Sequence, residues 1–224
     1  VNPMQFGPYE DLESYPRDLE KDASLCEASG VDLIFHPEPK EMYHPDFSSF
    51  VDMHGLTESL CGKSRPAHFR GVCTVVTKLF NIVQPDCAYF GQKDAQQLAV
   101  IQQMVRDLNL DVTVIGCPII READGLAKSS RNSYLSADER KAALVLSQAL
   151  EVAKQLLANG EQNAAKIRNA ISETIQAEPL AKVDYVELVD ARTLQQVDSV
   201  ERPVLVALAV YIGKTRLIDN FITE

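Results

Sequence analysis

The segment "YFGQKDAQQ", residues 89–97, places a lysine and an aspartate directly after a glycine, where a short apolar run gives way to a helical pattern. In an open α/β sheet, ligands bind at such an edge because helix N-terminal amides and their partial positive charge face the crevice. Lys93 can hold a phosphate there, and Asp94 can cap the helix or contact a ribose. Gln97, one helical turn after Lys93, is expected to project toward the same crevice. The competing interpretation is a capped surface helix with a solvated lysine, and this segment alone leaves both open.

The segment "KSSRN", residues 128–132, offers two hydroxyls, a guanidinium group and backbone amides within five residues. An arginine can spread over phosphate oxygens, and serines can donate to the charge that builds on a leaving pyrophosphate. Ser136, with Glu139 three residues later, is independently typical of a helix N-cap. The stretch is therefore either a phosphate-binding loop or a polar turn before a helix.

Two shorter stretches carry groups that suit a small acid. In "NPMQFG", Asn2 and Gln5 are neutral amides that can donate to and accept from a hydroxy acid or an amine. In "RPAHFRG", Arg65 and His68 precede a helical pattern and form a cationic cluster that could hold a carboxylate. A turn and a solvated surface loop are the respective alternatives.

The elements that must position these residues alternate between helix and strand. Apolar residues at helical spacing predict helices, and short apolar runs bounded by Gly or Pro predict buried strands. Helices are expected over residues 17–29, 70–83 and 92–110, and strands over 31–37, 87–91 and 111–119. This alternation is typical of an open, mostly parallel α/β sheet with helices on its faces.

The pattern changes after Cys117, where a polar connector begins. Helices are expected over residues 137–158 and 162–177, followed by strands with hairpin spacing to the end of the chain. This half is predicted to be α+β. We place the domain boundary near residue 118, so that the two domains span 1–118 and 119–224.

Composition excludes several classes of protein. The 224 residues carry a net charge of −10, which disfavours broad binding to nucleic acid or an anionic membrane, and no apolar run is long enough to span a bilayer. The five cysteines form no C-x-x-C pair and are odd in number, which argues against a zinc ribbon or a disulfide framework. With no signal segment at the start, the cytoplasm is the default location.

Five stretches, in this order and spacing, together resemble the pantothenate synthetase (pantoate:beta-alanine ligase) family. They are "VNPMQFG", "YPRDLEKD", "RPAHFRGVCTVVTKLFNIVQPD", "YFGQKDAQQLAVIQQMVRDLNL" and "READGLAKSSRNSYLS". The similarity runs from residue 1 to about residue 150 and weakens beyond it. The resemblance implies a Rossmann-like nucleotidyl-transferase domain with a parallel sheet, a smaller α+β C-terminal domain, and a cytoplasmic homodimer.

The resemblance also implies the reaction, which belongs to pantothenate and coenzyme A biosynthesis. ATP, with Mg2+, activates (R)-pantoate as pantoyl adenylate and releases pyrophosphate; beta-alanine then attacks to give pantothenate and AMP. Matching positions imply a catalytic set of Lys93, Ser129, Ser130 and Arg131. The ATP-binding positions are Gly91, Gln92, Lys93, Asp94, Ile120, Lys128, Ser129, Ser130 and Arg131, and those for pantoate and beta-alanine are Asn2, Gln5, Gln97, Arg65 and His68. No metal ligand is assigned.

The sequence departs from the family in two places. The family's His-x-Gly-His-like motif is expected upstream of Val1, so no proton donor is carried over, and Lys128 stands where the family usually has methionine or leucine. Three other interpretations stay open at this point. They are a catalytically inactive fragment of this enzyme, a related nucleotidyl transferase with another acid substrate, and an interaction module without activity.

Overall fold

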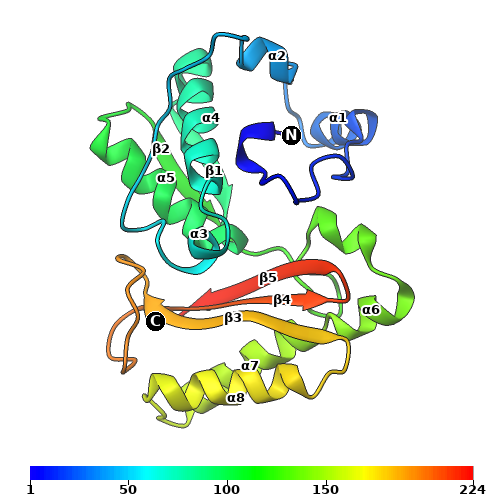
Figure 1. Ribbon diagram of the computed structural model, residues 1–224, viewed down its shortest axis with the longest axis vertical. Helices are drawn as coiled ribbons and strands as arrows, with labels where there is room; N and C mark the ends of the chain where they lie inside the picture. Colours follow the sequence, from blue (N-terminus) through cyan, green and yellow to red (C-terminus); the bar gives the residue numbers. More distant parts are fainter. Residues whose placement is uncertain (224) are drawn as a thin grey trace.

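The computed structural model describes residues 1–223 and shows an N-terminal and a C-terminal half, each built in layers (Figure 1). In the N-terminal half, at the top of the view, helices surround a small parallel sheet. In the C-terminal half, at the bottom, a pair of helices backs an antiparallel sheet. None of the described helices is both long enough and apolar enough to cross a membrane.

The N-terminal half is built around one strand-helix-strand unit. Strands β1 and β2 pair in parallel, from Cys87 opposite Thr113 to Gly91 opposite Cys117. Apolar side chains of α4 and α5 form its core, with Val72, Val100 and Ile101 at 1% exposure or less. The elements are η1 (Pro3–Gln5), α1 (Leu19–Ala28), α2 (Pro39–Met42), α3 (Leu60–Ser64), α4 (His68–Val83), β1 (Cys87–Gly91), η2 (Gln92–Asp94), α5 (Ala95–Asp107) and β2 (Thr113–Cys117).

The strand expected over residues 31–37 is absent, so this prediction was wrong. The segment is irregular, and its apolar side chains face solvent, with Leu33 77% and Phe35 46% exposed. A strand is stable only when a neighbour pairs its backbone. Within residues 1–223, β1 and β2 pair only with each other, and nothing completes a ladder for this segment.

The C-terminal half contains a three-stranded antiparallel sheet in the order β3-β4-β5. Helices α7 and α8 cover one face of it (Figure 1), and large apolar side chains fill the space between, including Leu146, Ile171 and Leu208. The predicted hairpin is confirmed, because Ile212 pairs with Thr215 around a two-residue turn. The elements are η3 (Ser130–Tyr134), α6 (Ala137–Ala142), α7 (Val145–Ala158), α8 (Ala164–Gln176), β3 (Ala181–Asp190), β4 (Val204–Ile212) and β5 (Thr215–Ile222).

Two predicted helices differ in detail from the structure. The helix expected over 137–158 is divided between α6 and α7, because backbone bonds at Leu144 and Leu146 reach back only three residues and tighten the chain there. The helix expected over 92–110 begins as the 3-10 turn η2 and becomes α-helical at Ala95. This turn carries Lys93.

The second face of the antiparallel sheet is turned toward the N-terminal half. A small apolar cluster joins the two halves, with Leu60 of α3 against Leu205 and Ala207 of β4. The candidate site lies beside this contact. β2 ends at Cys117 and every strand of the second sheet follows it, so we keep the domain division at residue 118 as a proposal.

Candidate active site

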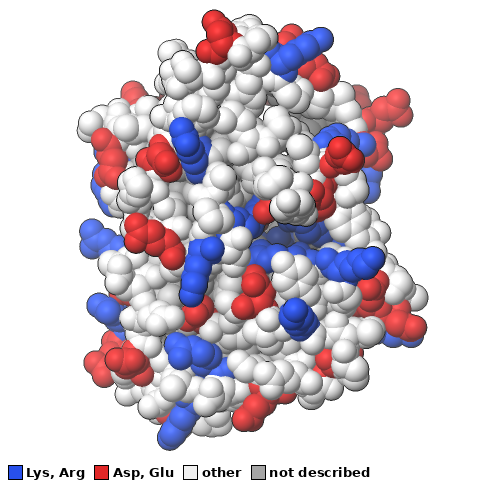
Figure 2. Space-filling view, in the orientation of Figure 1, with Lys and Arg blue, Asp and Glu red and all other residues white. Residues whose placement is uncertain are grey.

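A cleft between the two halves of the molecule collects residues from all four stretches that the sequence singled out. Lys and Arg side chains gather along this hollow in the space-filling view (Figure 2). Of the residues predicted from sequence, Arg65, His68, Lys93, Asp94, Gln97, Ser129 and Arg131 line its inner region, and Gln5 lines its outer region together with Arg65, His68 and Arg131. The fold thus brings the predicted phosphate-binding and acid-binding groups together.

Lys93 enters the cleft from the short turn η2 at the carboxyl end of β1. Its ammonium lies 3.8 Å from the carboxylate of Asp94, and its side chain is 19% exposed. Gln97 follows on the first turn of α5 and lines the same cleft. A half-buried cation at a strand-to-helix edge is suited to an anionic ligand such as a phosphate.

Arg65 and His68 form a connected pair at the start of α4. Arg65 donates to both carboxylate oxygens of Glu10 and to the carbonyl of Gln5, and its Nη1 lies 3.2 Å from His68 Nε2. His68 Nδ1 lies 2.9 Å from the same Gln5 carbonyl. Burial, together with the charge of Arg65, lowers the pKa of His68 to about 4. A neutral imidazole that donates from Nδ1 and accepts at Nε2 satisfies both contacts.

Asn2 does not line the cleft itself but orients Gln5, which does. The Asn2 amide donates to Gln5 Oε1 at 3.2 Å and to the Gly71 carbonyl at 3.1 Å. Its own oxygen accepts from the Tyr43 hydroxyl at 2.8 Å. In this arrangement Asn2 is satisfied by protein groups, and Gln5 is the amide that faces the cleft.

The loop before α6 carries Arg131 into the cleft. Ser129 caps η3 by accepting from the Arg131 amide at 3.3 Å. The Arg131 guanidinium donates two hydrogen bonds to Asp11, and its centre lies 5.4 Å from the ring of Tyr15. Ser136 forms a capping box with Glu139 at the start of α6, which confirms the helix cap predicted from sequence.

Several predicted nucleotide-binding positions lie outside the residues that line the cleft. Ile120 is 65% exposed, and its carbonyl accepts from the Lys128 amide at 2.9 Å, so these two residues pair through their backbones. The side chain of Lys128 is exposed. Gly91, Gln92 and Ser130 also lie outside the lining, as neighbours of residues within it.

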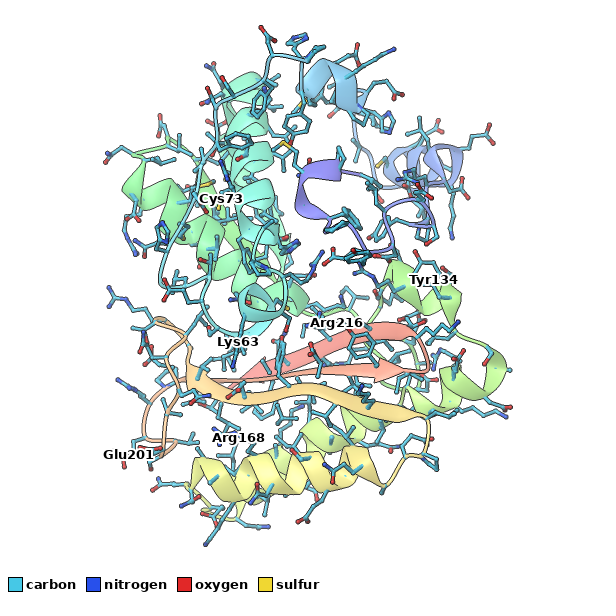
Figure 3. All side chains as sticks on the ribbon, in the orientation of Figure 1. Lys63, Cys73, Tyr134, Arg168, Glu201 and Arg216 are labelled. Atoms are coloured by element: carbon cyan, nitrogen blue, oxygen red, sulfur yellow. The ribbon has the colours of Figure 1, made fainter. Side chains whose placement is uncertain are left out.

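Sequence reasoning missed the contribution of the last strand. Arg216 of β5 lies on the sheet face that is turned to the N-terminal half (Figure 3) and lines both the inner and the outer region of the cleft. It donates to Asp184 Oδ2 at 2.8 and 3.0 Å, and its Nη2 lies 3.7 Å from the sulfur of Cys61. Asp219 and Asn220 follow on the same strand. The signal was present in "KTRLIDN", where Arg216, Asp219 and Asn220 lie in a stretch that was expected to form a strand.

Comparison with known proteins identifies the family. The family model described as pantoate-beta-alanine ligase matches residues 1–222. The chain belongs to the pantoate-beta-alanine ligase family. The match extends through the C-terminal half, beyond residue 150, where the motifs that carried the resemblance end.

Individual pantoate-beta-alanine ligases agree with this assignment. The pantothenate synthetase of Clostridium acetobutylicum is 63% identical over 221 residues, which cover 99% of this chain and 79% of that protein. The pantothenate synthetase of Enterococcus faecalis is 62% identical over the whole chain and 79% of its own length. The predicted family and enzyme class, an ATP-dependent ligase, are thereby confirmed.

Solved structures confirm the predicted fold. The crystal structure of pantothenate synthetase from Thermus thermophilus has a TM-score of 0.95 and 46% identity, covering 98% of this chain and 80% of that one. The ligase from Francisella tularensis, complexed with beta-gamma ATP and beta-alanine, has a TM-score of 0.76 and 33% identity, covering 99% of this chain and 76% of that one. An α/β N-terminal domain followed by a smaller mixed domain is common to them.

Proposed function

We propose that the cleft joins (R)-pantoate to beta-alanine at the expense of ATP, through a pantoyl adenylate. The observation that carries this proposal is the meeting of Lys93 and Arg131 with Gln5 and Gln97 in one cleft of a pantoate-beta-alanine ligase. The two cations suit a triphosphate, and the two amides suit the hydroxyl and carboxyl groups of pantoate.

In the first step, a pantoate carboxylate oxygen attacks the α-phosphorus of ATP, and the bond from that phosphorus to the bridging oxygen of the β-phosphate breaks. Pyrophosphate leaves with the electron pair. This step brings two anions together, so cations must screen the approach and stabilise the charge that moves to pyrophosphate. Lys93 and Arg131 supply these cations, and the Ser129 hydroxyl can donate to a phosphate oxygen.

In the second step, the amine of beta-alanine attacks the acyl carbon of the adenylate. The carbon–oxygen bond to AMP breaks, AMP leaves with one oxygen of the former carboxylate, and the nitrogen loses one proton to solvent. No covalent enzyme intermediate is needed, so positioning dominates this step. We assign the positioning to Gln5 and Gln97. His68 supports this arrangement as a neutral group that holds Arg65, because its low pKa leaves little imidazolium at neutral pH.

The nucleotide can bring Mg2+ with it. Magnesium in such sites is held by substrate phosphates and one or two carboxylates. Within residues 1–223, no cluster of three or more His, Cys, Asp or Glu side chains is arranged to hold a metal ion, and Asp94 places a single carboxylate next to Lys93 in the cleft. These residues fit an ion that the triphosphate would hold, and Asp94 would be its protein contact. When bound, Mg2+ neutralises phosphate charge.

The family resemblance further leads us to propose a homodimer located in the cytoplasm. Light scattering after size-exclusion chromatography tests the first point. For the reaction, the test is to supply ATP with pantoate or with other small hydroxy acids and to measure pyrophosphate release. Release that depends on pantoate supports the proposal, whereas preferential release with another acid identifies a different nucleotidyl transferase.

A further inference from the structure

Asn220 connects the last strand of the C-terminal sheet to the turn that carries Lys93. It lies on β5 and is 5% exposed. Its amide nitrogen donates to the carbonyl of Gln92 at 3.1 Å and to the carbonyl of Lys93 at 2.8 Å. A side-chain amide has two N–H donors, so each carbonyl can receive one.

These contacts fix a turn that has little support of its own. η2 comprises three residues of 3-10 geometry, which is poorer in hydrogen bonding than an α-helix. The Asn220 amide reaches it from 127 residues further along the chain and binds its backbone on both sides of the Lys93 α-carbon. The direction in which Lys93 enters the cleft is therefore set from the C-terminal sheet.

Asp219, the neighbouring residue on β5, holds the segment that leads to Arg131. Asp219, 1% exposed, accepts from Arg121 at 2.7 and 2.9 Å, and Arg121 also donates to the Gly125 carbonyl at 3.0 Å. Arg121 and Ala127 pair as an isolated bridge at the base of the loop that leads to Arg131. Two successive side chains of β5 thus hold the segments that carry Lys93 and Arg131.

We propose that Asn220 is a positioning residue for adenylate formation, acting through the backbone of η2 to aim Lys93 at the phosphates. This inference rests on the proposed function for its kinetic consequence and on the geometry alone for its structural one. Misplacing a catalytic cation by about 1 Å can cost on the order of 100-fold in rate. We assign pantoate to other side chains, Gln5 and Gln97, so its binding is expected to change little.

The test compares Asn220→Asp with Asn163→Asp. The first change turns the donor into a carboxylate facing two carbonyl oxygens. The second adds the same charge in the same half of the protein at the N-cap of α8, where an oxygen still accepts from the Lys166 amide. Asn220→Ala, which removes the donors without adding charge, is measured in parallel in case the aspartate variant does not fold.

The first readout is amide hydrogen exchange of residues 91–95, which needs no turnover. We expect exchange there to accelerate at least about 10-fold in the Asn220 variants, with β4 protected as in the unsubstituted protein and Asn163→Asp unchanged. Unchanged exchange at residues 91–95 in a folded variant would overturn the proposal. This readout remains decisive if the unsubstituted protein releases no pyrophosphate, a result that would count against the proposed function alone.

The second readout separates the two half-reactions. We expect kcat for pyrophosphate release from ATP and pantoate to fall about 10- to 100-fold, with KM for pantoate within about threefold. The reaction of preformed pantoyl adenylate with beta-alanine should change less than about threefold, because Lys93 acts before that step. Equal losses in both half-reactions would show a general structural defect and would refute a positioning role.

Discussion

The guanidinium of Arg131 donates two hydrogen bonds to the carboxylate of Asp11, at 2.9 and 2.8 Å, across 120 residues of chain. Glu10, the preceding residue, holds Arg65 in the same way. Arg65 and Arg131, two of the arginines that line the cleft, are therefore paired with adjacent carboxylates from the segment that follows η1. Burial raises the pKa of Asp11, but the Arg131 hydrogen bond and charge outweigh it, so that the pKa is lowered and the carboxylate stays ionised.

This pairing predicts competition between Asp11 and a bound phosphate. Asp11→Asn removes the competing charge, so ATP should bind about 3- to 10-fold tighter at low salt, and the gain should shrink at high salt. Calorimetric titration measures the affinity. Glu13→Gln, at an exposed position of the same segment, is the control and should change it little. Weaker ATP binding by Asp11→Asn would mean that the carboxylate holds Arg131 in place for the nucleotide instead.

Lys93 and Lys128 both match nucleotide-binding positions, but their substitution is predicted to affect adenylate formation very differently. Lys93→Ala should lower kcat for adenylate formation by about 10²- to 10³-fold, because a cation that stabilises transition-state charge is lost. Lys128→Ala should stay within about threefold, since this side chain is exposed and lies outside the cleft lining. Pyrophosphate release gives the rates, and pantoate affinity is measured alongside. Equal losses of adenylate formation and pantoate binding in Lys93→Ala would contradict the assignment.

The lowered pKa of His68 predicts that the folding stability of the protein depends on pH. Its pKa is lowered from 6.5 to about 4 by burial and by Arg65, so between these values the unfolded chain binds the proton more readily than the folded one. Folding stability should therefore fall as pH drops through this window, by up to about 1.4 kcal/mol per unit from this one group. Well above pH 6.5 the imidazole is neutral in both states and adds no slope.

Urea denaturation between about pH 7 and pH 4.5 measures this effect. His68→Gln should have a shallower decline than the unsubstituted protein, while His36→Gln, at an exposed position, should keep the original slope. Identical slopes for all three proteins would show that His68 takes up a proton as easily when folded as when unfolded.

The sequence predicted those elements whose formation depends on neighbouring residues. The β1-α5-β2 unit followed from helical spacing and short apolar runs, and the cap at Ser136 followed from its box with Glu139. The segment 31–37 has the composition of a strand, but strand formation depends on a pairing partner, which local pattern does not contain. The division between α6 and α7 was likewise invisible in a continuous alanine- and leucine-rich run.

The site residues that could not be predicted are those brought in by long-range contacts. Asp11, Arg216 and Asn220 are separated by up to 209 positions and meet around the cleft only when the C-terminal sheet folds against α3 and η2. Local motifs located Lys93 and Arg131. They could not show which carboxylates and amides hold these cations, because that depends on tertiary packing.

The pair between Asp219, which is buried, and Arg121, which is half-buried, predicts a loss of stability on substitution. Asp219→Asn leaves the Arg121 guanidinium without its charged partner, and losing hydrogen bonds to a charged group costs about 1.5–3 kcal/mol. Asp124→Asn, which breaks the exposed pair with Arg140, is the control and should change the free energy of unfolding little. Chemical denaturation measures both variants. Similar small losses in the two would mean that the Asp219 pair does not anchor the connector.

The central claim, that pantoate is activated as an adenylate, is tested most directly by following oxygen. Pantoate labelled with ¹⁸O in its carboxylate is supplied with ATP and beta-alanine, and the AMP is analysed by mass spectrometry. An acyl adenylate requires a carboxylate oxygen to bridge carbon and phosphorus and to depart with AMP, so we predict one ¹⁸O atom in each AMP and one pantothenate formed with it. Unlabelled AMP, or ADP in place of AMP, would contradict the account.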